Sequence, residues 1–479
     1  MFNTELTSKY LARFTTGFSS AKLVAAATPD NGIETPGSDE QLDLVINYRN
    51  QRNGLNILKF VPASGAATRM FQPLFQALAE IDGHRPMNVA ARKFLDNISV
   101  FPFAEMLDEV MQSEYGCQLQ AALEGEKYAD ILTAVLDKSG LNFAETPKAF
   151  IPFHRGADGH PETAMKAHFE EARRYASADG FARLHFTVAA DYLEMAREHA
   201  AACAFGYDDT VFEVSFSVQD PATDTPAVYE DNSAVLLDNG SVLMRPSGHG
   251  ALIYNLSNIE ADIIFIKNID NVAPASGVER QTHFKEMLAG RLLQLRDEVH
   301  NALRALETGD DSKARRLAHK FYKDLDSEVS AASLLKLLNV PIRVCGMVPN
   351  AGAPGGGPFW VRQNNGLATL QIVESAQTDT RNDAQMQIVQ GATHFNPVDI
   401  VCCIRDFKGK PFSLPDFIDN EAGFIVQKTY KGRKIKAIEL PGLWNGAMAR
   451  WISIFVEVPA FCFQPVKEIN DLLGPLHRG

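Results

Sequence analysis

Alternating strand-like and helical segments constrain the fold of this chain more than any other feature of its sequence. Short apolar runs typical of strands are predicted at residues 56–62, 149–153, 182–188, 211–217, 262–267, 341–348, 367–373 and 399–405. Apolar residues spaced as on one face of a helix are found at residues 87–94, 104–112, 128–137, 163–175, 190–204 and through most of 281–338. Strands that alternate with helices favour a largely parallel sheet covered on both faces, so we predict an α/β fold.

The length of the chain indicates more than one packed unit, because 479 residues exceed what a single hydrophobic core usually organises. We predict an N-terminal helical extension at residues 1–54, a core at 55–405 and a C-terminal region at 406–479. Within the core, helical insertions are predicted at about 74–146 and 281–338. No internal repeat is found.

Composition and charge narrow the classes of function. Hydrophobic residues make up 46% and charged residues 22% of the chain, as in ordinary soluble enzymes. The formal net charge of −13 argues against a nucleic-acid-binding protein, which needs a basic face. We predict no signal peptide at the N-terminus. We also predict no membrane span, because Glu457 and Pro459 interrupt the most apolar late run. Six cysteines without a Cys-x-x-Cys pair indicate reduced thiols, so we expect a cytoplasmic protein without zinc. The sequence makes no prediction of oligomeric state.

A loop of small residues follows the first predicted core strand and precedes a helical pattern. It consists of Ser64, Gly65, Ala66, Ala67, Thr68 and Arg69. Backbone N–H groups of such a loop can cradle an anion, and Arg69 can bind a phosphate group with two hydrogen bonds. A purely structural turn is the alternative reading of the same residues.

Three later segments also carry residues suited to phosphate chemistry. Lys148 follows Pro147 just before a predicted strand, although a lysine there is most often a solvated charge. Two glycines flank a histidine in Gly248-His249-Gly250, which suggests either close approach of the backbone to a ligand or a plain turn.

The third of these segments is Asn268-Ile269-Asp270-Asn271, which ends the predicted buried strand at 262–267. Ligands of open α/β sheets bind at the carboxyl ends of strands. The carboxylate of Asp270 is a hard oxygen ligand of the kind that Mg²⁺ prefers when it carries substrate phosphates. A simple turn is again the alternative.

In this order, the four motifs resemble those of the UDP-sugar pyrophosphorylases, a superfamily that includes UDP-N-acetylhexosamine and UTP–glucose-1-phosphate enzymes. The family's motif Gly-Gly-x-Gly-Thr-Arg-Leu is matched by Gly65, Thr68 and Arg69, whereas Ser64 and Ala67 replace glycines. In the family a Pro-Lys pair follows soon afterwards; here it comes only at Lys148, after the predicted insertion. The whole chain also resembles a bacterial family described as a domain of unknown function.

The resemblance implies a Rossmann-like glycosyltransferase-A-type nucleotidyltransferase core with a mixed, mainly parallel sheet. It implies an enzyme that joins a nucleoside triphosphate, with UTP favoured, to a sugar 1-phosphate and releases pyrophosphate with the help of Mg²⁺. The implied nucleotide-binding residues are Ser64, Gly65, Ala66, Ala67, Thr68, Gly248, His249 and Gly250. The implied catalytic residues are Arg69, Lys148, Asp270 (also the metal ligand) and Lys467, with Glu374 and Asn396 on the sugar.

Two other functions remain open on this core. A glycosyltransferase would usually end the metal-binding strand in Asp-x-Asp, whereas this chain has Asn268-Ile269-Asp270-Asn271. A catalytically inactive nucleotide-sugar-binding protein is favoured by the atypical residues Ser64 and Ala67 and by the distant position of Lys148.

Overall fold

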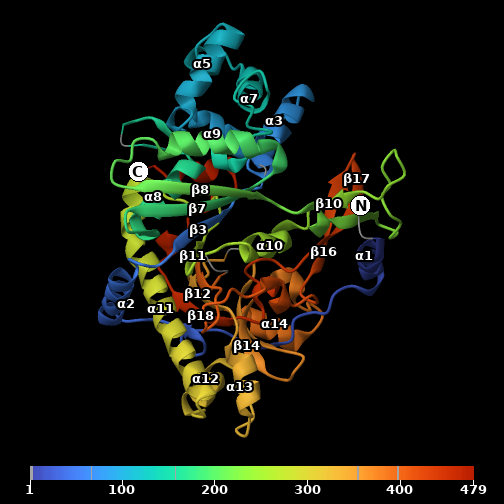
Figure 1. The fold of residues 1–479 in the computed structure, drawn as a ribbon. Helices are drawn as coiled ribbons and strands as arrows, with labels where there is room; N and C mark the ends of the chain where they lie inside the picture. The colour runs from blue at the N-terminus through green and yellow to red at the C-terminus, as the bar shows by residue number, and fades with distance from the viewer. Residues whose placement is uncertain (1–3, 66, 157, 353–354, 396–398, 479) are drawn as a thin grey trace. The chain divides into compact units, whose positions relative to one another are not determined.

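The computed structural model, drawn in Figure 1, describes residues 4–65, 67–156, 158–352, 355–395 and 399–478. The chain divides into two compact units. Unit 1 comprises Met1–Phe60, Ser217–Ile266 and Phe284–Ala460. Unit 2 comprises Val61–Phe216, Lys267–His283 and Phe461–Gly479. The chain therefore passes between the units several times instead of completing one before it begins the next.

A mixed, mainly parallel sheet forms the centre of unit 1. Its strands lie in the order β2 (Ile33–Glu34), β18 (Ile452–Glu457), β12 (Ile342–Met347), β15 (Asp399–Cys403), β11 (Ile263–Ile266) and β3 (Ile57–Pro62). Strand β15 is antiparallel to both of its neighbours, whereas the pairs β11–β3, β12–β18 and β18–β2 are parallel. All residues of β3, β11, β12 and β15 are buried, which explains their uninterrupted apolar sequences. The predicted α/β fold is confirmed.

Two smaller antiparallel sheets complete the β-structure described in unit 1. One contains β1 (Leu23–Ala26), β13 (Gly357–Arg362) and β14 (Ala368–Val373). The other contains β10 (Met244–Arg245), β9 (Thr225–Tyr229), β17 (Arg433–Glu439) and β16 (Phe424–Tyr430). Residues 1–54, predicted to be helical, supply strands β1 and β2 besides helices α1 (Thr4–Thr16) and α2 (Ser38–Gln51). Strands of two to four residues are too short to show an alternating pattern in the sequence.

The other helices of unit 1 are α10 (Leu252–Ser257), α12 (Ser312–Phe321), α13 (Ala331–Leu338) and α14 (Asp383–Gln390). Helices α12 and α13 lie within the predicted helical region 281–338, whereas α14 was not predicted. The long helix α11 (Ala275–Glu307) begins in unit 2 and continues in unit 1.

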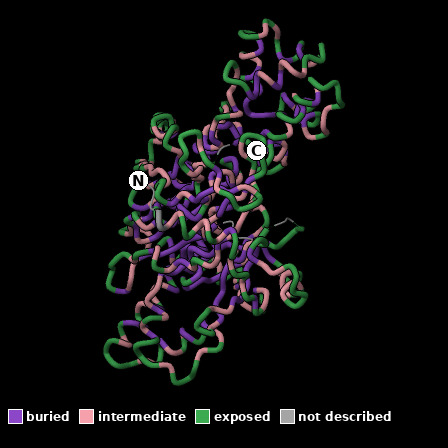
Figure 2. The backbone as a smooth tube through the Cα atoms, turned by 90° about the vertical axis from the view of Figure 1, so that its right-hand side faces the viewer, coloured by how far each residue is buried: buried purple, intermediate pink, exposed green. Residues whose placement is uncertain are grey.

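Helices dominate the first part of unit 2, as predicted for residues 74–146. They are α3 (Gln72–Asp82), α4 (Val89–Asp96), α5 (Ala104–Tyr115), α6 (Leu119–Glu124) and α7 (Tyr128–Leu136). Their buried sides, purple in Figure 2, pack around a cluster of touching aromatic rings. This cluster consists of Phe71, Phe94, Phe101, Phe103 and Phe143.

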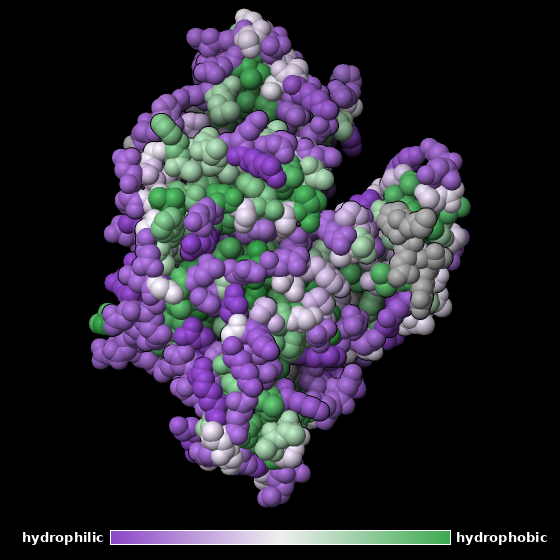
Figure 3. All heavy atoms as spheres, in the orientation of Figure 1, coloured by the Kyte–Doolittle hydropathy of each residue, from purple (hydrophilic) through white to green (hydrophobic). Residues whose placement is uncertain are grey.

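The remainder of unit 2 combines helices α8 (Ala164–Tyr175) and α9 (Leu193–Ala204) with five further strands. Strand β7 (Phe181–Val188) pairs with β6 (Ser177–Ala178) and β8 (Val211–Val218), and β4 (Pro152–Arg155) pairs with β5 (Pro161–Thr163). Figure 3 shows hydrophobic side chains gathered around α9 and β8, where Phe205 and Val211 are exposed. None of the helices described here has both the length and the apolar composition needed to cross a bilayer.

Candidate functional site

An ion pair between Lys148 and Asp270 lies at the centre of the candidate site in unit 2. Nζ of Lys148 donates a hydrogen bond to Oδ2 of Asp270 at 2.9 Å and another to the carbonyl oxygen of Val466 at 2.7 Å. The side chains of Lys148 and Asp270 are 12% and 24% exposed, so solvent reaches both. The two residues are 122 positions apart in the sequence, and the fold brings them into direct contact.

The C-terminal segment holds the loop that carries Asp270. The backbone N–H of Val466 donates to the carbonyl oxygen of Asp270 at 2.9 Å. The side-chain oxygen of Asn271, a buried residue, accepts from the N–H of Gln464 at 2.8 Å. Gln464 and Val466 therefore belong to the candidate site through their backbone, and the side chain of the next residue, Lys467, is exposed.

Backbone hydrogen bonds hold the small-residue loop after β3 on both of its sides. On its first side, the carbonyl oxygen of Pro62 accepts from the N–H of Ile269 at 3.3 Å. On its second side, the carbonyl oxygen of Met70 accepts from the N–H of Ile469 at 3.0 Å. The loop from Ser64 to Arg69 thus lies between anchor points next to Asp270 and to the C-terminal segment.

Within this loop, the described residues differ in exposure. Gly65, Thr68 and Arg69 are exposed, Ala67 is buried, and Ala67–Arg69 form a short 3₁₀ turn before α3. The guanidinium of Arg69 makes no hydrogen bond or ion pair with any residue in the described ranges. Ala66, predicted to bind the nucleotide, lies outside those ranges.

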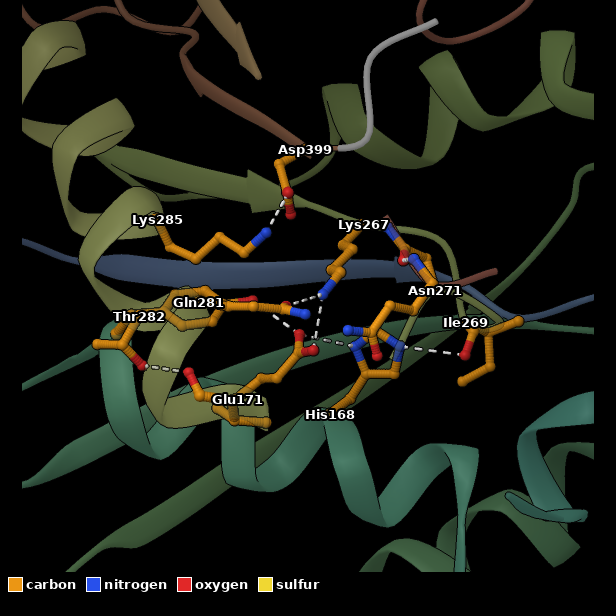
Figure 4. Close-up of polar contacts among 12 residues, drawn as sticks. His168, Glu171, Lys267, Ile269, Asn271, Gln281, Thr282, Lys285 and Asp399 are labelled. Atoms are coloured by element: carbon orange, nitrogen blue, oxygen red, sulfur yellow. Dashed lines mark hydrogen bonds and ion pairs between the residues drawn. The ribbon is translucent and has the colours of Figure 1, made fainter. Parts of the chain in front are cut away.

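A fully buried polar network holds the residues that precede Asp270 in the chain (Figure 4). Nζ of Lys267, the residue after β11, donates to Oε1 of Glu171 at 2.7 Å, and both side chains are at most 2% exposed. The hydroxyl of Tyr175 donates to Oε2 of Glu171 at 2.8 Å. Nε2 of His168, one turn earlier on α8, lies 3.3 Å from the carbonyl oxygen of Ile269, the residue before Asp270. The network therefore fixes the backbone on which Asp270 stands.

The donor set around Asp270 suits an ion that arrives with its substrate. Among the described residues, no group of three or more His, Cys, Asp or Glu side chains could hold a metal ion. Mg²⁺ in phosphate-transfer sites is commonly bound by one or two carboxylates, with water and substrate phosphates in the other positions. Asp270 supplies one partly exposed carboxylate, and its Oδ1 has no hydrogen-bond partner within the described chain. These residues are compatible with such an ion.

The histidine pair His154 and His477 attaches the last residues of the chain to unit 2. Nε2 of His154 lies 3.0 Å from Nδ1 of His477, and both side chains are buried. Burial lowers the pKa of His154 from 6.5 to about 3, with a smaller contribution from His477. Burial likewise lowers the pKa of His477 from 6.5 to about 4.

We expect unit 2 to lose stability in mild acid because of this pair. Both pKa values lie below the 6.5 of the unfolded chain, so the unfolded chain takes up protons first as the pH falls. The stabilisation is complete above about pH 6.5 and is lost as the pH falls towards 4; at pH 5 the loss is about 2 kcal/mol per histidine. Urea unfolding of the wild-type protein between pH 7.5 and 5 measures this loss. With His477→Leu the loss should shrink, whereas with His84→Gln, at an exposed site, it should not. An unchanged pH dependence in His477→Leu would contradict the assignment.

In unit 1, Trp444 contacts two residues that the sequence analysis predicts to bind the nucleotide sugar. Its ring centroid lies 4.2 Å from that of His249, with the ring planes at 61°. Its Nε1 donates to Oε1 of Glu374 at 3.2 Å. Glu374 also caps the 3₁₀ turn Ser375–Gln377 that follows β14. Asn396, the other residue predicted on the sugar side, lies outside the described residues.

The backbone conformation at one position beside His249 and close packing at the other explain why both residues are glycines. Gly248 has φ +70°, a conformation that glycine adopts without strain. A Cβ atom on Gly250 would lie 2.4 Å from Cβ of Leu440 and 2.9 Å from its carbonyl carbon. The close approach predicted for a ligand is therefore made, at Gly250, by the chain just after β17.

We expect Gly250→Ala to destabilise the protein by about 1–3 kcal/mol, because the added methyl group forces Leu440 and its backbone to move. Gly391→Ala is the matched control in the same unit, since its Cβ would meet nothing closer than 3.4 Å. Thermal and chemical denaturation of the two variants measure the difference. Equal stability of both variants would show that this packing contact is not tight.

Several residues of these sites were not predicted to be functional from the sequence. They are Glu171, Lys267, Trp444, Gln464 and Val466. A signal existed for two of them: Lys267 ends a buried apolar strand, and Glu171 lies on the apolar face of an amphipathic helix, so each needed a buried partner. Gln464 and Val466 contact the site through backbone atoms, so their residue types gave no signal in the sequence.

Comparison with known proteins places the chain in a family. A family model described as "Domain of unknown function (DUF4301)" matches residues 2–478. No curated protein matches the chain.

Two solved structures are similar at low identity. A mutant UDP-glucose pyrophosphorylase from Leishmania major, in complex with UDP-glucose, is 13% identical with a TM-score of 0.42. The uridine diphosphate N-acetylglucosamine pyrophosphorylase from Trypanosoma brucei, in complex with an inhibitor, is 12% identical with a TM-score of 0.47. Each alignment covers 98% of this chain and 74% of the other. Similarity at this level does not assign an activity. The family match over residues 2–478, in contrast, shows that this chain belongs to the DUF4301 family.

Proposed function

We propose that the protein is a nucleotidyltransferase that joins a nucleoside triphosphate, with UTP favoured, to a sugar 1-phosphate and releases pyrophosphate. The observation that carries this proposal is the contact between Lys148 and Asp270 beside the loop Ser64–Arg69. A lysine, an exposed arginine and a carboxylate at the carboxyl end of a buried strand are the groups that phosphate transfer needs. The order of the motifs in the sequence supports the same reaction.

In the proposed reaction, a phosphate oxygen of the sugar 1-phosphate attacks the α-phosphorus of the triphosphate. A new P–O bond forms as the bond to the β-phosphate oxygen breaks, and pyrophosphate leaves. The attacking phosphate is already ionised at neutral pH, so no general base is required. The main obstacle is the repulsion between two polyanions, which positioned cations reduce.

Each residue of unit 2 has a separate role in this scheme. Arg69 and the loop backbone would bind the β- and γ-phosphates, and Lys148 would neutralise the α-phosphate. Lys467 would bind the phosphate of the sugar. Asp270 would hold Mg²⁺, which when bound neutralises phosphate charge and stabilises the leaving pyrophosphate.

The residues of unit 1 are proposed to provide specificity. Gly248, His249 and Gly250 are proposed to contact the base or ribose, and Glu374 and Asn396 the sugar hydroxyls. The carboxylate of Glu374 is suited to this role because it is partly exposed and its position is set by a cap and by Trp444.

A catalytically inactive binding protein is the second candidate, because two of the three Nζ protons of Lys148 are already bound by Asp270 and Val466. For catalysis, the remaining proton must meet the substrate or the ion pair must open. This candidate predicts that UDP-sugars bind but are not turned over.

A pyrophosphate-release screen tests the proposal. The common ribonucleoside triphosphates are each combined with a panel of sugar 1-phosphates in the presence of Mg²⁺. We expect pyrophosphate only when both substrates are present, with UTP most active, and none after chelation of the metal. Tight binding of UDP-sugars in calorimetry without turnover would favour the binding protein. Release of UDP from a UDP-sugar in the presence of an acceptor would favour a glycosyltransferase.

A further inference from the structure

Strand β8 has an open edge to which a further strand can be added. Among the described residues, β7 is the only strand with which β8 pairs. The N–H of Val211 donates to the carbonyl oxygen of Gly180, just before β7, at 2.9 Å. Successive residues of a strand direct their backbone groups to opposite sides, so Phe212, Val214 and Phe216 direct theirs away from β7. None of these three residues makes a hydrogen bond on that side with a residue that the structure describes.

Two of the usual protections of an edge strand are missing from β8. Edges of natural sheets often carry a proline or several charges, which discourage pairing with another chain. Between Val211 and Phe216 there is no proline, and Glu213 is the only charged residue. Its carboxylate accepts a hydrogen bond from Nε of Arg183 on β7 at 2.8 Å, so this charge is already paired. The edge is therefore suited to pairing with another strand.

A largely apolar groove of about 470 Å³ lies between β8 and helix α9. Its walls include three small residues of the helix and three apolar residues of the strand: Ala200, Ala201 and Ala204, and Phe212, Val214 and Phe216. Hydrophobic surface continues around the groove (Figure 3), where the side chains of Phe205 and Val211 are 85% and 56% exposed. Contiguous apolar surface of this kind marks an interaction site.

The sequence of β8 is nearly symmetric about Val214, which favours a second copy of this chain as the partner. Antiparallel pairing centred on Val214 sets Phe212 opposite Phe216 of the other copy, and Val214 opposite its own counterpart. It also sets Glu213 opposite Ser215, so that no like charges face each other. Pairing centred one residue earlier would instead bring the two Glu213 carboxylates together.

The same pairing would satisfy the open edge and cover the groove. The outward N–H and carbonyl groups of Phe212, Val214 and Phe216 would bond to those of the other copy. A two-fold axis perpendicular to the strands would relate the copies, so that equivalent faces of the two strands lie on the same side. The apolar side chains of one β8 would therefore lie beside the groove of the other copy.

We propose that the protein forms a homodimer through antiparallel pairing of two β8 strands about Val214. The inference does not depend on the proposed catalytic function, because none of the residues that carry it belongs to the candidate site.

Sedimentation velocity of the full chain tests for this dimer. Between about 1 and 200 µM protein, the mean mass should rise from that of one chain towards that of two. Val214→Pro removes an outward N–H at the axis but no hydrogen bond to β7, and should weaken dimerisation about tenfold or more. Circular dichroism checks that this variant folds.

Two substitutions of Ser215 test the register of the pairing. This residue is exposed, and in the proposed dimer it faces Glu213 of the other copy. Ser215→Lys should tighten the dimer and Ser215→Glu should weaken it, each about threefold or more, because the contact occurs twice in the dimer. Both variants lose the hydrogen bond between Ser215 and His185, so the difference between them reports the effect of charge.

Matched controls and the opposing outcomes complete the test. Ser113→Lys and Ser113→Glu make the same charge changes at an exposed site on α5, and should leave dimerisation unchanged. The proposal is overturned if the chain stays monomeric at about 200 µM. It is also overturned if the two Ser215 variants dimerise equally well, or if a folded Val214→Pro variant dimerises like the wild type. Because Ser215 is exposed, its variants keep the test valid even if Val214→Pro does not fold.

Discussion

Replacing Lys148 or Asp270 with alanine is expected to lower the rate of pyrophosphate formation by about a hundredfold to a thousandfold. In the proposed reaction, each variant removes a charge that would act on the phosphates as the transition state forms. Lys148→Ala also leaves the Asp270 carboxylate without its cation, which adds repulsion towards the incoming substrates. The measurement is kcat and kcat/KM on the substrate pair found by the screen.

A matched lysine in the same unit provides the control. Lys138 also forms an ion pair, at 3.0 Å from Glu145, but both side chains are more than half exposed. Lys138→Ala should keep nearly full activity. The double variant Lys148→Ala/Asp270→Ala should be much less impaired than the product of the two single effects, because the residues act on the same step. Near-wild-type turnover in both single variants would rule out the assigned roles.

Replacing Lys267 with methionine is expected to destabilise the protein by about 3–5 kcal/mol, because it leaves a buried carboxylate without its charge partner. Nζ of Lys267 lies 2.7 Å from Glu171, and solvent reaches neither side chain appreciably. Urea unfolding followed by circular dichroism measures the change in the free energy of unfolding.

A second substitution separates loss of charge balance from loss of packing. In Lys267→Met/Glu171→Leu the unpaired charge is absent, so a large part of the stability should return. Lys138→Met, at the exposed pair with Glu145, should cost no more than about 1 kcal/mol. If the double variant were less stable than Lys267→Met alone, the network would contribute through its hydrogen bonds and not through charge balance.

The elements of the fold were largely predictable from local sequence. The buried strands β3, β11, β12 and β15 appear as apolar runs within one or two residues of their bounds, and α8 appears as an amphipathic pattern. Such patterns show whether one face or both faces of a segment are buried, and this information lies within the segment itself. Among the missed strands, β1, β2 and β10 have two to four residues, and β16 and β17 are partly exposed, so neither length nor hydrophobicity marks them. Strands β9, β13 and β18 were also missed, although nearly all of their residues are buried.

The candidate site was predictable only as a set of separate residues. The residue types pointed to phosphate chemistry, but nothing local indicated that Lys148 would meet Asp270, or that the backbone of Val466 would bind both. The supporting pair Lys267 and Glu171 spans 96 positions and likewise becomes visible only in three dimensions.

By itself, then, the sequence determined the α/β class, the positions of most elements and the chemical character of the candidate site residues, because periodicity and residue type are encoded within a few neighbouring positions. Tertiary structure alone decided which distant residues touch, that Gly250 packs on Leu440, and that the last residues of the chain return to hold the Asp270 loop. Those outcomes depend on how buried surfaces and backbone hydrogen bonds are satisfied together across the folded chain, which no single segment specifies.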